Sequence, residues 1–235
     1  MTMASGRSGP PRPAGDPGAE PPCSVGDPGA EPPYPVGDPG AEPPPRDVAA
    51  LWPAALEALA RASRAACAAP GPEEALRELT RVCPALLGDK QAHVRPGALQ
   101  PGERPFSVCG AFMLTPDRRH NLLVADVGFP PEQHRLRIDV ELGHPGWVVR
   151  QRAPLILANT DLDPNFKQIL KTARMGSALY APMIWKGELL GQIVCASQAR
   201  HTYEQTDLDV LVAFAETGTA LWLAHDGPAF LSRIA

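Results

Sequence analysis

The chain has 235 residues and a formal net charge of −4, with 22 lysines and arginines against 26 aspartates and glutamates. Residues 1–46 hold three basic and six acidic residues, a net of −3, which leaves −1 for residues 47–235. A nearly neutral globular part argues against a nucleic-acid partner, because such a partner needs a basic face. No secretory signal follows Met1 and no apolar run is long enough to cross a bilayer, so we expect no membrane partner and a cytoplasmic location.

Residues 1–46 are predicted to be a disordered, acidic tail. They hold 14 of the 29 prolines and almost no large apolar side chains, so they cannot form a core. Within them, Gly-Asp-Pro-Gly-Ala-Glu-Pro-Pro occurs three times, beginning at Gly15, Gly26 and Gly37, with a period of 11 residues. Proline at this density favours polyproline II, so we expect a semi-stiff spacer, with a proline-binding partner as the alternative.

Residues 47–235 are predicted to form one domain that begins with an alanine-rich helix over residues 47–69. Pro53 fits only the first turn of that helix, so the chain before it is expected to lie outside. A second helix begins at Gly71-Pro72, kinks or ends at Pro84, and is stopped by Gly88. The first helix has an apolar stripe made of Trp52, Leu56, Leu59, Ser63 and Cys67.

The middle of the chain reads as strands of an antiparallel sheet. Residues 106–114 and 122–127 have the composition of paired strands, and residues 135–142 alternate cleanly between apolar and polar side chains. A short helix is expected over residues 144–152. A second one opens at Asp163-Pro164, an N-cap followed by a proline, and ends at Gly176.

The last third is predicted to be a hairpin followed by a long helix. The hairpin runs from Leu179 to Ala196 around a Lys186-Gly187 turn. Thr206 and Asp209 have the spacing of a capping box at the start of the final helix. Helices at both ends of a mostly antiparallel sheet indicate the α+β class.

The order of the predicted elements from Arg135 to Ala224, together with the turn residues between them, resembles that of GAF domains, the small-molecule-sensing relatives of PAS domains. The resemblance covers roughly residues 71–226 and rests on these stretches: Gly143 to Val149, Pro154 to Asn159, Ser177 to Met183 and Leu189 to Val194. It implies an antiparallel sheet of five or six strands with helices on both sides. It also implies a cap from His144 to Gly176 over a ligand pocket whose floor surrounds Val108, Val124, Tyr180 and Val194.

The resemblance does not name a ligand. No cysteine precedes a histidine, as a bilin attachment site in the family would require, and Ser197-Gln198 stands where the cyclic-nucleotide class has Asn-Lys. His144 is the histidine nearest the cap, but His-Pro-Gly is more typical of a turn than of a haem ligand. The cofactor is therefore left open.

Enzymatic activity is not expected. The family's enzymatic exception reduces free methionine sulfoxide with a cysteine in the turn before the cap helix, and this chain has Gly143-His144-Pro145-Gly146 there. Cys109 and Cys195 lie on predicted strands and can approach one another, which keeps a thiol-dependent reductase as a minority alternative.

No metal site is expected either. The five cysteines, at positions 23, 67, 83, 109 and 195, are odd in number and lack CxxC spacing. The acidic residues Glu141, Asp161 and Asp163 are an alternative set of metal ligands, but Asp163 is better explained as a helix cap.

The candidate site residues follow from this pattern. Trp147 and Phe166 are the aromatic residues of the cap, with core packing as the alternative explanation. Tyr180 alternates to the face opposite its strand neighbours, where its hydroxyl can meet a ligand. Asn159 follows a short strand and has no capping role. Two strand residues complete the predicted ligand-binding set, which is Val108, Trp147, Asn159, Phe166, Tyr180 and Cys195.

The expected partners are a small-molecule ligand, a second copy of the chain and a downstream regulatory protein. The sequence reads as a stand-alone GAF module without an output segment, so its signal is expected to pass through another protein. GAF domains commonly dimerise through their terminal helices, and small residues here allow close approach. These are Ala55, Ala58, Ala62 and Ala66 in the first helix, and Ala213, Thr217, Ala220 and Ala224 in the last. A ligand-free interaction module is the alternative function.

Overall fold

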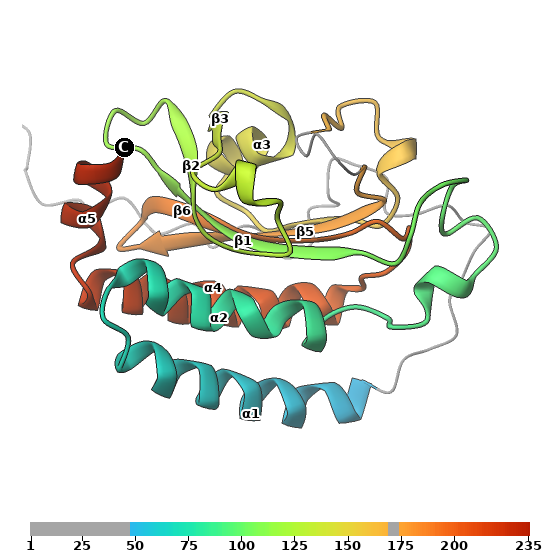
Figure 1. The fold of residues 1–235 in the computed structure, drawn as a ribbon, viewed down its shortest axis with the longest axis horizontal. Helices are drawn as coiled ribbons and strands as arrows, with labels where there is room; N and C mark the ends of the chain where they lie inside the picture. Colours follow the sequence, from blue (N-terminus) through green and yellow to red (C-terminus); the bar gives the residue numbers. More distant parts are fainter. Residues whose placement is uncertain (1–47, 169–173) are drawn as a thin grey trace, which may run out of the picture. The chain divides into compact units, whose positions relative to one another are not determined.

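An antiparallel sheet of six strands is the centre of the structure (Figure 1), a computed structural model that describes residues 48–168 and 174–235. The strand order is β3-β2-β1-β6-β5-β4. The strands are β1 (Ser107–Leu114), β2 (His120–Val127), β3 (Arg137–Asp139), β4 (Leu155–Leu157), β5 (Ser177–Trp185) and β6 (Glu188–Ser197). The predicted tail over residues 1–46 lies outside the described residues, so the tail and the domain boundary stay predictions.

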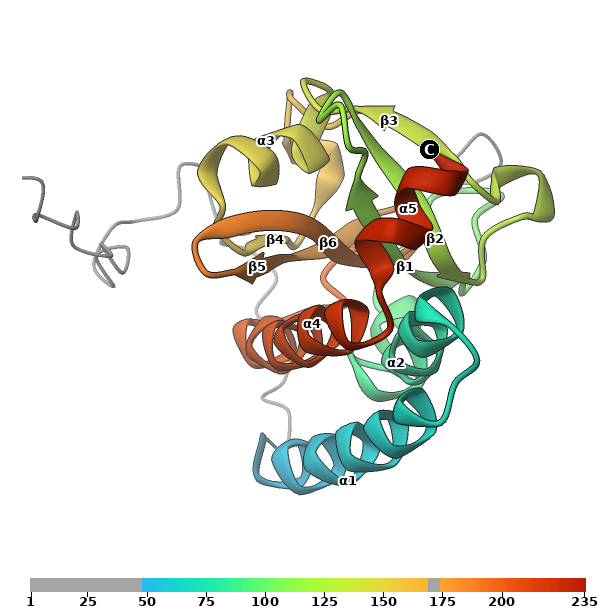
Figure 2. The same cartoon turned by 90° about the vertical axis from the view of Figure 1, so that its left-hand side faces the viewer.

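Helices cover both faces of this sheet (Figures 1 and 2). On one face, which we call the helix side, lie α2 (Pro72–Leu86) and α4 (Gln205–Ala224), and α1 (Val48–Cys67) packs beneath them as an outer layer. On the other face, the cap side, lies α3 (Gly143–Gln151). The predicted α+β class, an antiparallel sheet with helices on both sides, is therefore confirmed. A final helix, α5 (Gly227–Ile234), was not predicted.

The hairpin of β5 and β6 confirms the clearest local prediction. Lys186 and Gly187 connect the two strands, with φ angles of 49° and 79°. Positive φ at both central residues is what a tight two-residue hairpin turn requires, and glycine adopts it without strain.

Strand alternation sends neighbouring side chains to opposite faces of the sheet, so two separate apolar clusters form. On the helix side, the three central strands contribute Cys109, Ala111, Met113, Leu179, Ala181, Met183, Ile193 and Cys195. On the cap side, they contribute Val108, Phe112, Ala178, Tyr180, Val194 and Ala196.

Val124 is on the helix side, so its predicted place in the pocket floor is wrong. The cause is a β-bulge in the pairing of β1 with β2, where the register shifts between Ala111 and Phe112. A bulge places one extra residue in a strand, so Val124 and Ala125 both join the helix-side cluster.

The predictions for α1 are wrong at two points. The helix begins at Val48, five residues before Pro53. Pro53 is exposed, and it is tolerated because it lies near the start of the helix, where few backbone hydrogen bonds are lost. Its buried face is also not the predicted stripe, since Trp52 is 46% exposed and Leu56 is 70% exposed. The alanines proposed for dimerisation, Ala55, Ala58, Ala62 and Ala66, are instead buried within the chain.

β3 is much shorter than the strand predicted over residues 135–142. Only Arg137–Asp139 pair with β2. Arg135 has φ of 63°, a left-handed conformation that interrupts a strand. Its guanidinium instead pairs with Glu73 of α2 and donates to the carbonyl of Val124.

A capping box does begin α4, but it lies two residues before the predicted one. Glu204 is the N-cap and Asp207 the third helical residue, in place of Thr206 and Asp209. Asp207 is fully buried, and its carboxylate accepts from the backbone N–H of Glu204 (3.0 Å) and of Gly88 (2.8 Å). One side chain therefore ties the start of α4 to the end of α2.

None of the described helices combines the length and the hydrophobicity that a bilayer crossing requires.

Asp207→Ala is expected to lower the free energy of unfolding by about 3 kcal/mol, because two buried N–H groups lose their acceptor. Asp209→Ala, the matched control, removes only an exposed contact with Gln205 and is expected to cost less than about 0.5 kcal/mol. Urea unfolding of both variants measures the difference, and equal losses would contradict the role given to Asp207.

Candidate functional site

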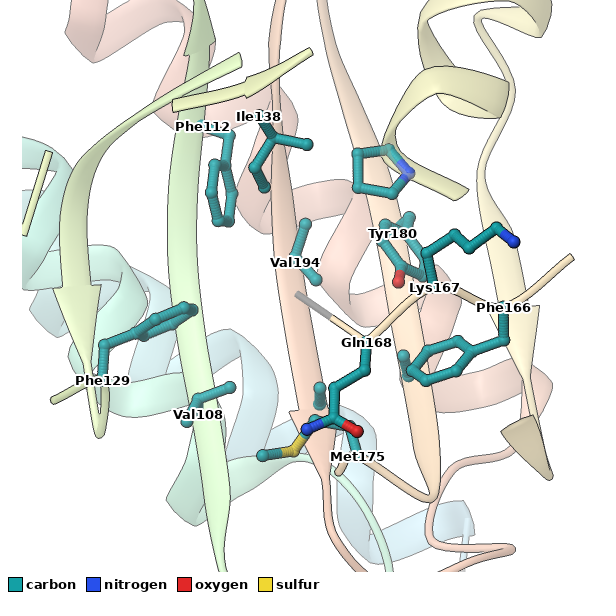
Figure 3. Close-up of a pocket in the computed structure, with 13 residues that line it drawn as sticks. Val108, Phe112, Phe129, Ile138, Phe166, Lys167, Gln168, Met175, Tyr180 and Val194 are labelled. Carbon is teal, nitrogen blue, oxygen red and sulfur yellow. The ribbon is translucent and has the colours of Figure 1, made fainter. Parts of the chain in front are cut away.

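A cavity lies between the cap side of the sheet and the cap, by which we mean the described residues from Gly143 to Gly176 (Figure 3). Its empty volume is about 520 Å³, including the space at its open mouth. Its lining is mostly apolar and consists of Val108, Phe112, Phe129, Ile138, Pro145, Phe166, Lys167, Gln168, Met175, Ala178, Tyr180, Val194 and Ala196.

The floor of the cavity comes from every second residue of the central strands. Val108 and Phe112 extend from β1, Tyr180 from β5 and Val194 from β6. Because these strands are neighbours in the sheet, residues far apart in sequence form one continuous apolar surface. Phe129 packs edge-on against Phe112 at one side, with ring centroids 6.2 Å apart.

Close backbone approach places the start of α3 over this floor. A side chain at Gly146 would put a Cβ atom 2.4 Å from the carbonyl oxygen of Val140, so only glycine fits. Nearby, the Gln192 amide donates to the carbonyl of Pro145 at 3.1 Å. These contacts bring the Pro145 ring to the cavity wall.

A buried histidine–aspartate pair holds the cap together. His144 Nε2 lies 2.9 Å from Asp163 Oδ2, and both side chains are more than 90% buried. The imidazole stacks on Phe166, with ring centroids 6.0 Å apart, and lies 6.2 Å from the Tyr180 ring. Burial lowers the pKa of His144, and the neighbouring Asp163 offsets part of that effect.

The helix predicted to open at Asp163 is not present over residues 163–168, where the chain forms a turn and then irregular backbone. The rest of that prediction includes residues 169–173, which lie outside the described residues. The Asp163 carboxylate accepts from the N–H of Asn165 at 2.8 Å and contacts His144. An aspartate that bonds its own turn in this way favours a turn over a helix.

Among the described residues that line this cavity, Tyr180 provides the only hydroxyl group. Its side chain is on β5, the residue is 5% exposed, and the hydroxyl lies among the side chains of Val194, Phe166 and Gln168 in Figure 3. Within the described part of the chain, that hydroxyl has no hydrogen-bond partner. Burial, and to a lesser extent the charge of Asp163, raises the pKa of Tyr180, so the group stays a neutral phenol.

Of the six predicted site residues, the structure brings three together at this cavity: Val108, Phe166 and Tyr180. Trp147 packs half-buried against the cap-side cluster and does not line the cavity. Asn159 has the capping role that the sequence did not show, because its side chain accepts from the N–H of Asp161 at the start of η3 (Thr160–Leu162).

Cys195 is also misplaced by the prediction. It follows Val194, so alternation sends it to the helix side, where Cys83 and Cys109 are buried with it. Cys109 is directly opposite Cys195 in the pairing of β1 with β6, which confirms that these two cysteines approach one another. Burial raises the pKa of Cys109 well above its ordinary value. No described cysteine lines the cavity.

Sequence analysis missed several lining residues. Phe112 follows Val108 on the same face of one strand, so alternation alone could have found it. Phe129 and Ile138 come from a loop and from an edge strand, and their convergence depends on the sheet order, which the sequence does not encode locally. In the described part of the chain, no group of three histidine, cysteine or acidic side chains is placed to hold a metal ion.

Comparison with protein-family models identifies a GAF domain over residues 98–221, more than half of the chain. The chain therefore belongs to the GAF domain family. A search of curated proteins finds no relative that matches the sequence.

Solved structures show the same fold. The GAF domain of a phosphoenolpyruvate-protein phosphotransferase from Coxiella burnetii aligns with a TM-score of 0.63 and 23% identity, over 79% of this chain and 99% of that one. The corresponding domain from Acinetobacter gives 0.60 and 17%, over 73% and 94%. A free methionine-R-sulfoxide reductase from Neisseria meningitidis, in complex with its substrate, gives 0.59 and 14%, over 79% and 95%.

Protonation of His144 is expected to destabilise the fold. Its pKa in the folded chain is below the ordinary 6.5, so its contribution is complete above about pH 6.5 and is lost as the pH falls toward the folded pKa. The loss approaches about 1.4 kcal/mol per pH unit in that window. Urea unfolding at pH 7.5, 6.5 and 5.5 should therefore show a steeper fall for the parent than for His144→Gln.

Asp163→Asn tests the His144–Asp163 pair by changing the aspartate. Removing the carboxylate removes what raises the pKa of His144, so its imidazole should titrate at lower pH, as followed by NMR. An unchanged His144 titration, or a parent and His144→Gln with parallel pH profiles, would contradict this account.

Proposed function

We propose that this chain is a non-catalytic sensory module that binds a small, uncharged and mostly apolar molecule beneath its cap. GAF domains are generally ligand-binding regulatory modules, and the cavity offers a place for such a ligand. The output of this module is passed to a partner protein.

The observation that carries the proposal is the hydroxyl of Tyr180. The hydroxyl lies in the wall of the cavity rather than in packed core, so a polar atom of a ligand can hydrogen-bond to it. As a neutral phenol it can donate to a carbonyl or ether oxygen, or accept from a hydroxyl.

The charge of the lining supports an uncharged ligand. Among the described lining residues, Lys167 is the one charged side chain. It is exposed, and in Figure 3 its ammonium group points away from Val108 and Val194. A carboxylate or phosphate seated on the floor would lose its hydration without gaining a counter-charge, which is costly. Rings and short aliphatic groups instead match the side chains of Phe112 and Phe166.

A thermal-shift screen of the full chain tests this directly. The panel should contain pairs of compounds of equal size. In each pair, one member is an uncharged phenol, amide or alcohol and the other is the matching carboxylate. A ligand that binds only the folded chain must raise its melting temperature, and we expect the uncharged member of a pair to do so. For the best compound, Tyr180→Phe should weaken binding about three- to tenfold by calorimetry, the equivalent of one hydrogen bond.

Tyr203→Phe is the matched control for that measurement. Tyr203 is buried on the helix side, where its hydroxyl lies 3.4 Å from Cys195 Sγ, so this variant should leave the affinity unchanged. The proposal fails if anions bind better than their neutral partners, or if the two tyrosine variants weaken binding equally. No shift across the panel would favour the interaction module described next.

A ligand-free interaction module that forms a homodimer is the second candidate. Trp52 and Leu56 favour it, because these two large apolar side chains of α1 are exposed and lie outside its buried alanine face, which we call the outer face of α1. Exposed apolar surface of this kind is typical of interfaces. Since the alanines of α1 are used within the chain, the outer face of α1 is the candidate surface on that helix, and Ala213, Thr217, Ala220 and Ala224 remain the candidate face on α4.

Light scattering of the full chain should give about twice the chain mass of 25.0 kDa. The double variant Trp52→Glu, Leu56→Glu is expected to give the mass of one chain, because charges at an interface core prevent association. Leu162→Glu, which alters an exposed apolar residue of η3, should leave the dimer intact. A parent mass near 25.0 kDa at all concentrations would reject this candidate.

Thiol-dependent reduction of methionine sulfoxide is the third reading, raised by the structural likeness to the Neisseria enzyme. Identity of 14% supports the fold alone. The placement of Cys83, Cys109 and Cys195 on the helix side, away from the cavity, gives this activity no support. Reduction of methionine sulfoxide by the parent chain that is lost in Cys109→Ser or Cys195→Ser would support this activity.

A further inference from the structure

A second hollow lies at the C-terminal end of α2. It shares no lining residue with the cavity beneath the cap. It is bounded by the end of α2, by η1 (Ala92–Val94) and by the start of β1, and its empty volume is about 590 Å³, including the space at its mouth. We call it the Phe106 groove, after its one aromatic lining residue. Pro84, Leu87, Ala92, Pro105 and Ala199 are its other apolar lining residues.

We propose that the Phe106 groove binds the third proline-rich repeat of this same chain, Gly37 to Pro44. Segments with a polyproline II preference dock into shallow grooves lined by aromatic and proline rings, because they lose little conformational entropy when they bind. The repeat itself has no aromatic residue, and the groove supplies one.

The charges of the groove and the repeat are complementary. Lys90 lines the groove, where its ammonium group donates to the carbonyls of Pro84 and Leu87. The Arg104 guanidinium lies over the Phe106 ring, 5.9 Å from its centroid. Among the described residues of the lining, Asp89 is the one acidic side chain, and it is paired with Arg95. The repeat carries Asp38 and Glu42 and no basic residue.

The length of the connecting chain favours the third repeat over the other two. Because α1 and α2 run in opposite directions, Figure 1 shows the start of α1 at the same end of the helix pair as the end of α2. Pro44 is four residues before Val48, so the repeat spans about 12 to 35 Å from the helix start at polyproline spacing. Packed helices are about 10 Å apart, so the end of α2, which borders the groove, is within this reach.

The first and second repeats are 22 and 11 residues farther from α1. A longer tether lowers the effective concentration of a segment at its site, so these two repeats compete poorly for the groove. A segment held in this way excludes any other proline-rich segment from the Phe106 groove.

NMR of the full chain tests the proposal. The variant Glu42→Lys, Pro43→Ala, Pro44→Ala should shift the amide resonances of Lys90, His93 and Phe106. The same three changes in the first repeat, at Glu20, Pro21 and Pro22, are the matched control and should leave them in place. A synthetic peptide with the sequence of residues 37–44 should bind the third-repeat variant about tenfold more tightly than the parent, because the tethered repeat no longer competes.

His93→Glu in the parent is expected to reproduce the loss on the groove side, since it adds a negative charge to a groove that receives an acidic repeat. The proposal is overturned if the third-repeat variant leaves the groove resonances unchanged, or if the control variant shifts them equally. Shifts that grow with protein concentration would place the tail in the groove of a second copy and overturn binding within one chain.

Discussion

The fold depends on three central strands that are covered on both faces. β1, β6 and β5 are hydrogen-bonded neighbours, and nearly all of their residues are buried. Alternation therefore commits each side chain either to the helix side or to the cap side, and the two sides are used differently. On the helix side, α2 and α4 lie against the sheet and fill the space with a continuous apolar core.

The cap side is closed by polar contacts at its margins. At one margin His144 pairs with Asp163. At another, Arg200, whose side chain is 1% exposed, donates to Asp161 at 2.8 Å and pairs with Glu103. Buried ion pairs contribute little net stability, but they fix positions, because a partner that moves away leaves a buried charge unpaired. The cap is therefore held at a defined height over an apolar floor, with a cavity between them.

Sequence reasoning succeeded where the signals were local and unopposed. The Lys186-Gly187 turn and the start of α2 at Pro72 depend on residues next to them in the chain, and both were predicted. At Asp163 the local signals were equally consistent, but the carboxylate pairs with His144, 19 residues earlier, and the described residues that follow form no helix. The bulge that moved Val124 to the helix side depends on how two strands pair, which alternation within one strand does not show.

The residues of the candidate site were likewise predictable only where the local pattern was regular. Val108 and Tyr180 were placed correctly because each lies in a strand whose alternation is regular. Trp147 is in the short helix α3 and Asn159 precedes η3, so strand alternation does not place either of them. Alternation also shows how this site is joined to the rest of the molecule. Tyr180 faces the cavity, and its neighbours Leu179 and Ala181 face the helix-side core, where β5 packs on α4. Under the proposed function, a ligand that moves the backbone of β5 at Tyr180 also moves the surface on which α4 rests, with no loop between them. In a close-packed core such a shift must be taken up by the helices, since few voids are available to absorb it.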